Sequence, residues 1–409
     1  MFTQASFDHR PVRRCRTRAA TVWAFGWGLG GALALTPSVQ AQLAVAPNAS
    51  GNAVGTSLPI HTIPLNIPGT YTFPPPPAAF DPETASRGAT QAYGLPPMPD
   101  KQTHPKAYAS WLNAVSIPNR ITPVLAKTNL YHLPRQAAPT SAAPPMGAQH
   151  QLTETPVQAV TNSLNWSGFS VYNASGPFTI EAVAGAYVVP VARNPFGQCP
   201  NNPQYDVWSS YWVGIDGFAN NALFQNGVEA DGYNDCSGSY QYYAAWIEWI
   251  PGPEFRVLNA PVEAGDYIFV ENYTTSATTG CFFWANESQQ WSSTICTSAG
   301  ALGGNAITGS SVEWITERPY TGEHAFGFAY LTNYVTAPWW QAYAYNYTSG
   351  SPTFYYPGFA PSGTLYLVSA IDDGGGLISY PYLAGTDSIF FYDYGSAYCY
   401  PGASCTPRY

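Results

Sequence analysis

From Asn162 onward, short apolar runs alternate with clusters of Gly, Asn, Pro and Ser. The runs are rich in aromatic and β-branched residues, as strands are, and none of them repeats with the 3.6-residue period of a helix. The pattern predicts strands at 184–191, 206–216, 240–250, 266–274, 311–318, 324–331, 364–371 and 388–394. We therefore expect an all-β domain, a β-sandwich of two antiparallel sheets.

The first 41 residues have the pattern of a secretory signal peptide. Arginines at positions 10 to 18 form a basic start, an uncharged stretch follows at 19–35, and Val39-Gln40-Ala41 supplies small residues for cleavage. A membrane anchor fits less well because the stretch is barely long enough and contains Gly. We expect a secreted, extracellular protein with no membrane association after cleavage.

Charge divides the remainder into two parts. Residues 42–160 are Pro-rich and mildly basic, whereas residues 161–409 contain four Arg, no Lys and nineteen Asp and Glu. A basic segment before an acidic domain is typical of a propeptide, with a flexible linker or spacer as the alternative. We expect a signal peptide at 1–41, a propeptide or linker at 42–160, and a catalytic domain at 161–409.

Six cysteines remain after the signal peptide, an even number that suggests three disulfides in an oxidising compartment. Sequence order suggests the pairs Cys199–Cys236, Cys281–Cys296 and Cys399–Cys405, although six cysteines allow fifteen pairings.

Several chemistries lack their residues in the acidic domain. Its one histidine, His324, lies in an apolar run without a nucleophile motif, so a Ser–His–Asp site or a His-based zinc site is not expected. Gly374-Gly375-Gly376 follows two Asp, which repel phosphate, and the acidity disfavours nucleic acid. Paired Asp-Thr/Ser-Gly motifs are missing too. We expect no cofactor and no metal.

Carboxylate and amide chemistry remain. Glu248 and Glu313 each lie between Trp and aliphatic residues in a predicted strand. Burial raises the pKa of a carboxyl group unless a cation or hydrogen bonds compensate, and cations are scarce here. Each Glu is therefore a functional candidate. The alternative is that each one simply bonds a group of a neighbouring strand.

Four segments, in this order and spacing, resemble the glutamic peptidases (eqolisins, scytalidoglutamic peptidase-like), which are secreted acid endopeptidases with a β-sandwich fold. The segments are Asn165–Gly168 (NWSG), Tyr211–Gly217 (YWVGIDG) with Gln225 eight residues later, Trp246–Pro251 (WIEWIP) and Val312–Pro319 (VEWITERP). The resemblance covers the domain from Asn162 to about Asp393.

The resemblance implies that Gln225 and Glu313 form the catalytic pair. Glu313 would act as general base and then general acid, and Gln225 would orient the water and stabilise the oxyanion. Trp212, Asp216 and Glu248 match motif positions: Trp212 would line the cleft, and Asp216 and Glu248 would support its hydrogen bonds. Trp166 would lie beside the same cleft, and simple core packing or sheet pinning is the alternative for all four. The partners implied are protein or peptide substrates, and we expect a monomer.

The stretch 336–359 and the tail with Cys399 and Cys405 have no counterpart that we can place in the compact family pattern. The stretch 336–359 is thus expected to be an insertion. Two rival functions remain: a sandwich-type glycoside hydrolase or carbohydrate-binding protein, with Glu248 and Glu313 as its acid/base pair, and a non-catalytic surface or adhesion protein.

Overall fold

The computed structural model describes residues 61–138, 157–174, 179–194, 206–235, 238–322, 327–347, 353–373 and 375–394. The chain divides into two compact units, Met1–Gly55 and Thr56–Tyr409, and all the described residues belong to the second unit. His324 and the cysteines expected in the pairs Cys199–Cys236 and Cys399–Cys405 lie outside the described residues.

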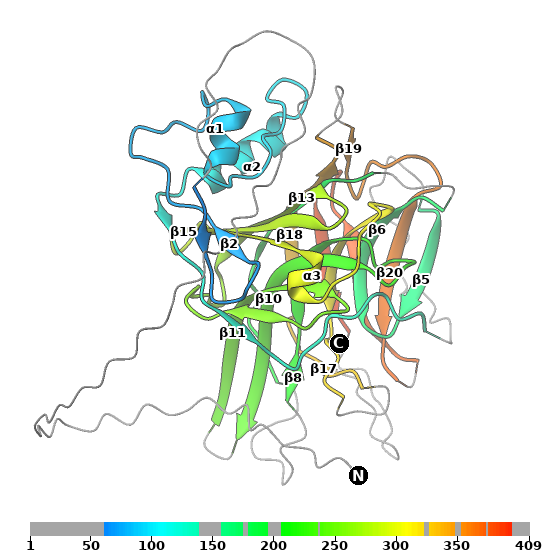
Figure 1. Cartoon of the computed structure of the whole chain (residues 1–409). Helices are drawn as coiled ribbons and strands as arrows, with labels where there is room; N and C mark the ends of the chain where they lie inside the picture. The colour runs from blue at the N-terminus through cyan, green and yellow to red at the C-terminus, as the bar shows by residue number, and fades with distance from the viewer. Residues whose placement is uncertain are drawn as a thin grey trace, which may run out of the picture. The chain divides into compact units, whose positions relative to one another are not determined.

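Strands dominate the described part of the chain, and the predicted all-β class is confirmed (Figure 1). One arm of the sheet is an antiparallel series of neighbours: β12 (Phe255–Val257), β11 (Gly238–Ile250), β10 (Leu223–Asp235), β9 (Ser210–Ile215), β16 (Ser311–Glu317) and β6 (Trp166–Tyr172). The other arm runs through β15 (Trp291–Ser298), β14 (Thr279–Asn286), β13 (Tyr267–Ser276), β7 (Ala182–Val188) and β18 (Thr336–Tyr345).

Three strands connect the two arms into one continuous sheet: β20 (Leu365–Ile371), β21 (Leu377–Leu383) and β22 (Ile389–Asp393). Short strands complete it: β1 (Ile63–Pro64), β2 (Tyr71–Thr72), β3 (Asn119–Arg120), β4 (Leu125–Lys127), β5 (Ala159–Ser163), β8 (Val207–Trp208), β17 (Tyr330–Leu331) and β19 (Phe354–Tyr355). The pairs β5–β20, β3–β15 and β8–β17 are parallel, so the sheet is not purely antiparallel.

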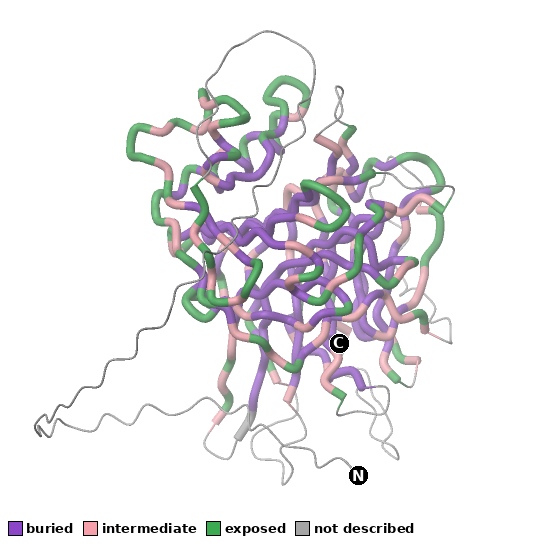
Figure 2. The backbone as a smooth tube through the Cα atoms, viewed as in Figure 1, coloured by how far each residue is buried: buried purple, intermediate pink, exposed green. Residues whose placement is uncertain are grey.

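The two arms face each other across the main core. Side chains of one arm donate hydrogen bonds to backbone carbonyls of the other, from Asn272 to Val213 at 2.9 Å and from Trp314 to Ala184 at 2.8 Å. The strand interiors are buried (Figure 2). Because side chains alternate between faces, the residues between these core positions point to the other face of β9, β10, β11 and β16. That other face carries the candidate site.

The N-terminal segment is packed against the strands and contains helices that its Pro-rich composition did not predict. Helix α1 spans Arg87–Ala92 and is capped by Ser86, whose hydroxyl accepts from the Ala89 amide. Helix α2 (Pro105–Val115) begins with Pro at a position that tolerates it, and buries Trp111 in a cluster with Phe283 and Tyr343. The third helix, α3, spans Ala299–Leu302.

Two further expectations concern particular segments. The stretch 336–359, expected to be an insertion, contains β18. This strand pairs with β7 and β22 and is therefore an integral part of the sheet. A disulfide joins Cys281 on β14 to Cys296 on β15, one of the three expected pairs. Within the described ranges, helices are all too short or too polar to cross a bilayer.

Candidate active site

The strand register brings the family-motif residues into rows. Directly across β6, β16, β9, β10 and β11, one row runs Ser170, Glu313, Gly214, Gln225 and Glu248. Residues opposite each other share a face of the sheet, so Gln225, Glu248 and Glu313 all project to the face away from the main core.

Two more rows lie on the same face. The row two residues further along contains Ile315, Trp212, Gly227 and Trp246, and the next contains Glu317, Ser210 and Glu229. Trp212, Trp246 and Ile315 pack in a small buried cluster together with Trp166. The site is thus a set of buried carboxyl groups and one amide between tryptophans.

Gln225 binds a backbone segment that crosses this face. Its Nε2 atom donates to the carbonyl oxygen of His132 at 2.7 Å and to Glu248 Oε2 at 3.0 Å. The same Glu248 oxygen accepts from the His132 amide at 2.9 Å. All three residues are fully buried. Gln225 therefore points a hydrogen-bond donor at a peptide carbonyl.

The imidazole of His132 lies on this face, enclosed by a tryptophan ring and several carboxyl groups. It stacks on Trp246 with the ring centroids 3.9 Å apart and an interplanar angle of 12°. Its Nε2 atom lies 2.9 Å from Glu254 and 3.5 Å from Glu229, and its Nδ1 atom lies 3.6 Å from Glu317. Carboxyl groups from β10, from β16 and from the turn before β12 thus surround one ring.

Glu317 is held from several sides beside the same segment. Its Oε2 atom accepts from Trp212 Nε1 at 2.8 Å and its Oε1 atom accepts from Asn165 Nδ2 at 3.0 Å. Asn165 Nδ2 also donates to the carbonyl oxygen of Leu133 at 2.9 Å, and Trp166 Nε1 reaches that oxygen at 3.0 Å. Glu317 is therefore adjacent to the backbone just after His132.

Glu313 lies further from this segment along the sheet. Its Oε1 atom accepts from Ser170 Oγ at 3.1 Å. Gly214 separates it from Gln225 in the row, and a Cβ atom added to Gly214 would come within 2.8 Å of the Trp212 ring. The Trp212 ring thus covers the sheet between Glu313 and Gln225.

Asp216 fixes a neighbouring loop. It adopts a positive φ of 69°, and its carboxylate accepts from the Ser310 amide at 2.9 Å, from the Gly309 amide at 3.3 Å and from Thr308 Oγ1 at 3.0 Å. Because this loop leads directly into β16, Asp216 supports the strand that carries both Glu313 and Glu317.

Burial dominates the protonation of these groups. It raises the pKa of Glu248, Glu313 and Glu317, with His132 opposing the effect at Glu248 and Glu317 and serine hydroxyls opposing it at Glu313. Burial and the nearby Asp231 raise the pKa of Glu229. The site therefore favours neutral carboxyl groups.

For Glu254 and His132, neighbouring charges outweigh burial and decide the direction of the pKa shift. Burial would raise the pKa of Glu254, but Arg256 and His132 outweigh it and lower that pKa. Burial would lower the pKa of His132, but Glu229, Glu254, Glu317 and Glu248 together raise it well above its ordinary value. The pair is thus an imidazolium and a carboxylate.

His132, Glu229 and Glu254 are also the one group that could hold a metal ion within the described ranges, with ligand atoms within 4.8 Å of one another. The hydrogen bond between His132 and Glu254 accounts for the spacing of two of these residues, and Glu229 lies 3.5 Å from the same His132 nitrogen.

Sequence reasoning missed four residues of the site. His132 lies in the Pro-rich segment and has no motif of its own. Glu317 lies inside the quoted VEWITERP segment, four residues after Glu313 and therefore on the same face. Glu229 follows Gln225 by four residues in the same way. Glu254 follows the WIEWIP segment, and only its place in the turn brings it to His132.

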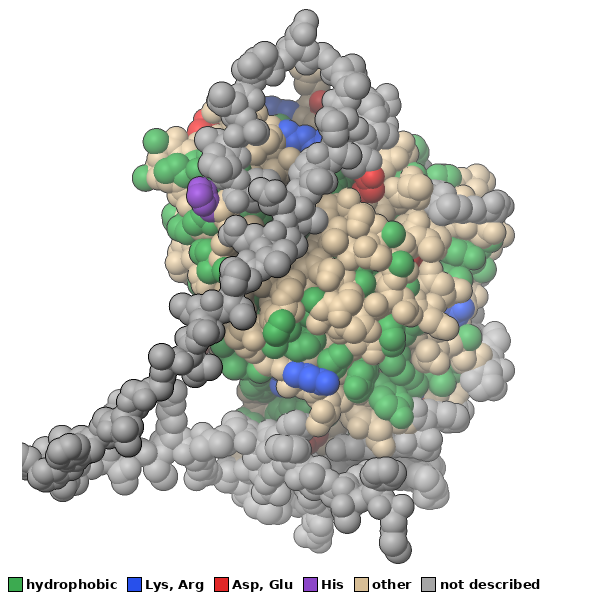
Figure 3. Space-filling view, in the orientation of Figure 1, with side chains coloured by type: hydrophobic (Ala, Val, Ile, Leu, Met, Phe, Trp, Pro, Cys, Tyr) green, Lys and Arg blue, Asp and Glu red, His purple; other side chains and the backbone are tan. Residues whose placement is uncertain are grey.

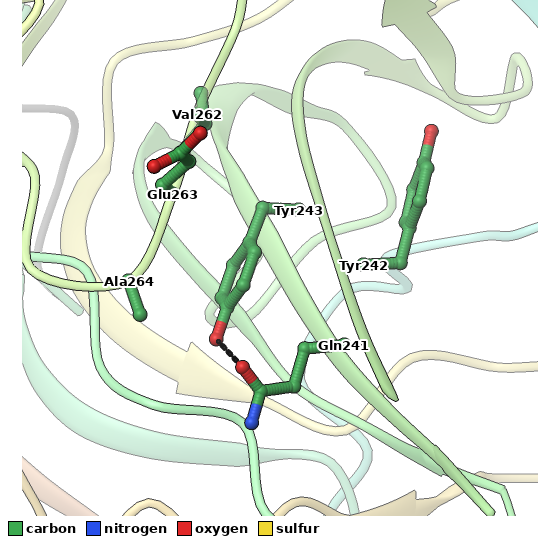
Figure 4. A pocket seen from close by; sticks show the side chains of 6 residues that line it. All are labelled: Gln241, Tyr242, Tyr243, Val262, Glu263 and Ala264. Atoms are coloured by element: carbon green, nitrogen blue, oxygen red, sulfur yellow. Dashed lines mark hydrogen bonds between the residues drawn. The ribbon is translucent and has the colours of Figure 1, made fainter. Parts of the chain in front are cut away.

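A solvent-open hollow lies on another part of β11. Gln241, Tyr242, Tyr243, Val262, Glu263 and Ala264 line it, and Tyr243 donates to Gln241 across it at 3.2 Å (Figure 4). None of these residues belongs to the buried carboxyl cluster.

A comparison with known proteins places this arrangement in a class. Residues 164–354 match the model of the peptidase A4 family. This domain belongs to that family, the glutamic peptidases or eqolisins. The protein is a hydrolase, a glutamic-type endopeptidase. No curated protein matches the chain.

Solved structures with similarity to the chain include members of this family. Scytalido-glutamic peptidase with a transition state analog inhibitor is 19% identical, with 56% of this chain and 98% of that chain covered and a TM-score of 0.43. SCP-B, an eqolisin in complex with the tripeptide Ala-Ile-His, is 20% identical, with 56% of this chain and 98% of that chain covered and a TM-score of 0.40. Aspergilloglutamic peptidase from Aspergillus niger is 25% identical, with 46% of this chain and 99% of that chain covered and a TM-score of 0.37.

Proposed function

We propose that the protein is a secreted acid endopeptidase in which Gln225 donates a hydrogen bond to the carbonyl oxygen of the scissile peptide bond. The observation that carries this proposal is the 2.7 Å contact from Gln225 Nε2 to the backbone carbonyl of His132. A donor at that position stabilises the negative charge that develops when water attacks the carbonyl carbon. Glu248, which accepts from the same amide nitrogen, keeps the donor oriented.

We further propose Glu317 as the general base, with Glu313, the residue that sequence analysis selected, as the alternative. Glu317 borders the backbone segment that Gln225 binds, whereas Glu313 lies beyond the Trp212 ring. Glu317 would take a proton from the attacking water and pass it to the leaving nitrogen. Trp212 and Asn165 hold its two oxygens in place for both transfers.

Trp166 and Asp216 have supporting roles in this proposal. Trp166 donates to the carbonyl one residue beyond that of His132, so it would hold the substrate backbone in register. Asp216 ties down the loop that leads into β16 and would thereby fix the position of the base.

The proposal includes the precursor organisation. The two stacked arms would form a β-sandwich, the first 41 residues a signal peptide, and the segment up to about residue 160 a prosegment. Charged side chains are sparse on the described part of the face in Figure 3, and nine of the nineteen acidic residues at 161–409 are buried. The absence of Lys from residues 161–409 limits positive self-repulsion in acid.

Replacing Gln225 with Ala should lower kcat for peptide cleavage by about 10²–10³-fold while KM changes little, because the donor acts on charge present only in the transition state. The measurement is steady-state cleavage of a fluorogenic peptide at pH 4, with circular dichroism to verify the fold. Asn226→Ala, at a buried neighbour on the opposite face, is a control for general disturbance of β10. Full activity of Gln225→Ala would remove Gln225 from this role.

Chelators should leave activity unchanged, because this mechanism uses only Glu and Gln groups. Casein digestion at pH 4 would be measured with and without excess EDTA or 1,10-phenanthroline. A loss that added Zn²⁺ restores would instead assign His132, Glu229 and Glu254 to a metal.

The rival glycoside hydrolase would need two carboxyl groups flanking a sugar. A polysaccharide screen beside the casein assay separates the two functions, since the peptidase should release no reducing ends.

A further inference from the structure

One segment of the N-terminal part crosses the candidate site. On one side of the site the Tyr131 carbonyl accepts from the Tyr320 amide at 2.9 Å, and on the other side the Gln136 amide donates to Asn165 at 2.9 Å. Between them lie the contacts of His132 with Gln225 and Glu248 and those of Leu133 with Trp166 and Asn165.

The contacts flank one peptide bond on both sides. On its acyl side, the carbonyl of His132 accepts from Gln225, the proposed oxyanion donor. On its amine side, Arg135 donates its amide to the Gly217 carbonyl at 3.1 Å, and its guanidinium lies 4.7 Å from the Phe218 ring. The bond between His132 and Leu133 therefore occupies the position at which a scissile bond would react.

The side chain on the acyl side fills a selective pocket. The pocket around His132 is formed by the flat ring of Trp246 and by carboxyl groups near both nitrogens of the imidazole. A planar cation brings positive charge within 3.6 Å of Glu254, Glu229 and Glu317 at once and a hydrogen bond to Glu254, which an aliphatic side chain could not do. The neighbouring acids raise the pKa of His132, so the ring carries the charge that the pocket favours.

We propose that residues 130–136 are the enzyme's own first substrate, cleaved between His132 and Leu133, and that the His132 pocket selects His on the acyl side of cleaved bonds. This inference rests on the proposed function. Until the bond is cut, the segment blocks the site. Water adds its oxygen to the His132 carbonyl carbon, the bond to the Leu133 nitrogen breaks, and the water proton passes through the general base to that nitrogen.

The first test follows the full chain after a shift from pH 7 to pH 4, by intact mass and N-terminal sequencing. We expect a fragment that starts at Leu133, and we expect casein digestion to rise as this fragment forms. In His132→Ala the fragment should form at least about tenfold more slowly, by analogy with the loss of one well-fitted contact. His104→Ala is the matched control, because His104 lies in the same part of the chain but stacks on Phe354.

A second measurement does not depend on how His132→Ala folds. The peptide with the sequence of residues 128–137 (TNLYHLPRQA) is added to acid-treated wild-type enzyme, beside the same peptide with Ala in place of His. We expect cleavage after His in the first peptide and at least about tenfold slower cleavage in the second.

The outcomes separate the inference from the proposed function. If casein is digested while the His132–Leu133 bond and the His peptide stay intact, the segment is an inhibitor or a structural strap and the inference fails. Equal cleavage of the two peptides would overturn the selectivity of the pocket. If a folded protein digests neither casein nor peptide, the proposed function itself fails.

Discussion

Glu317→Gln is expected to reduce kcat for peptide cleavage by about 10²–10⁴-fold, whereas Glu313→Gln should stay within about tenfold of wild type. Gln keeps the size of the Glu side chain, and its single oxygen can still accept from either Trp212 or Asn165. It cannot take a proton from water. The loss should therefore fall on kcat, with KM nearly unchanged.

The pair of variants forms its own control, because the two Glu residues share a strand, a face and full burial. Activity would be measured at pH 3, 4, 5 and 6 on one fluorogenic peptide, after thermal melts verify that both variants fold. Loss in Glu313→Gln with retention in Glu317→Gln would return the role of base to Glu313.

The pH profile should have two limbs with distinct causes. Activity should fall at low pH as the base becomes protonated. It should also fall as pH rises and the raised-pKa groups Glu248, beside Gln225, and Glu229, beside His132, ionise, because negative charge near the site opposes a developing oxyanion. If Glu229→Gln leaves the alkaline limb where it is, Glu229 does not set it.

The ambiguity between the two Glu residues shows where sequence reasoning ends. Alternation correctly puts Trp212 and Glu248 in strands, and motif spacing identifies the family, whereas the strand that carries Gln225, β10, was not among the predicted ones. A period of two, however, gives Glu313 and Glu317 the same face. The register puts Glu313 in the row of Gln225 and Glu317 in the row of Glu229, and only the contacts of Glu317 with Asn165 and Trp212 show that Glu317 borders the segment that Gln225 binds.

His132 could not be found from local patterns. It lies 93 residues before Gln225, in a Pro-rich segment whose composition favours an extended chain. What fixes it is tertiary: a ring-sized space beside Trp246 and carboxyl groups from three parts of the domain. The helices α1 and α2 were missed for a related reason, since packing of residues such as Trp111 overrides weak propensity.

The protein should be more stable at pH 4.5 than at pH 7. Burial raises the pKa of Glu229, Asp231, Glu248, Glu271, Glu313 and Glu317. The folded chain keeps these protons at a pH at which the unfolded chain has released them. Their stabilising contribution is therefore complete below the ordinary carboxyl pKa and is lost as pH rises through each raised pKa.

Two groups refine this expectation. His132, with a raised pKa, also stabilises the fold below its ordinary pKa and loses that contribution at higher pH. Glu254, with a lowered pKa, stabilises the fold at higher pH and loses its contribution only as pH falls through the lowered value. Stability should therefore peak in moderate acid and decline on both sides.

The slope can be given a scale. If the folded chain holds two protons more than the unfolded chain, the free energy of unfolding falls by about 2.8 kcal/mol per pH unit. Between pH 5 and pH 7 that corresponds to a fall in Tm on the order of 10 °C. Calorimetry from pH 3 to pH 8 measures it, and a Tm that rises toward pH 7 would contradict protonated burial of these groups.

Glu271 is one of these buried acidic residues, and it lies away from the candidate site, so its effect on stability can be measured separately. It is fully buried on β13 and accepts from the Tyr345 hydroxyl at 2.8 Å, a bond that an amide oxygen can also accept. Glu271→Gln should leave the melting temperature at pH 4 nearly unchanged and raise it at pH 7, because the variant has no proton to lose. The pH slope of its free energy of unfolding should be smaller than that of the wild type by about 1.4 kcal/mol per pH unit.

Glu83→Gln, at an exposed position paired with Lys101, is the control that should follow the wild type. An unchanged slope in Glu271→Gln would mean that the folded chain already holds this carboxylate ionised, with compensation from groups other than Tyr345.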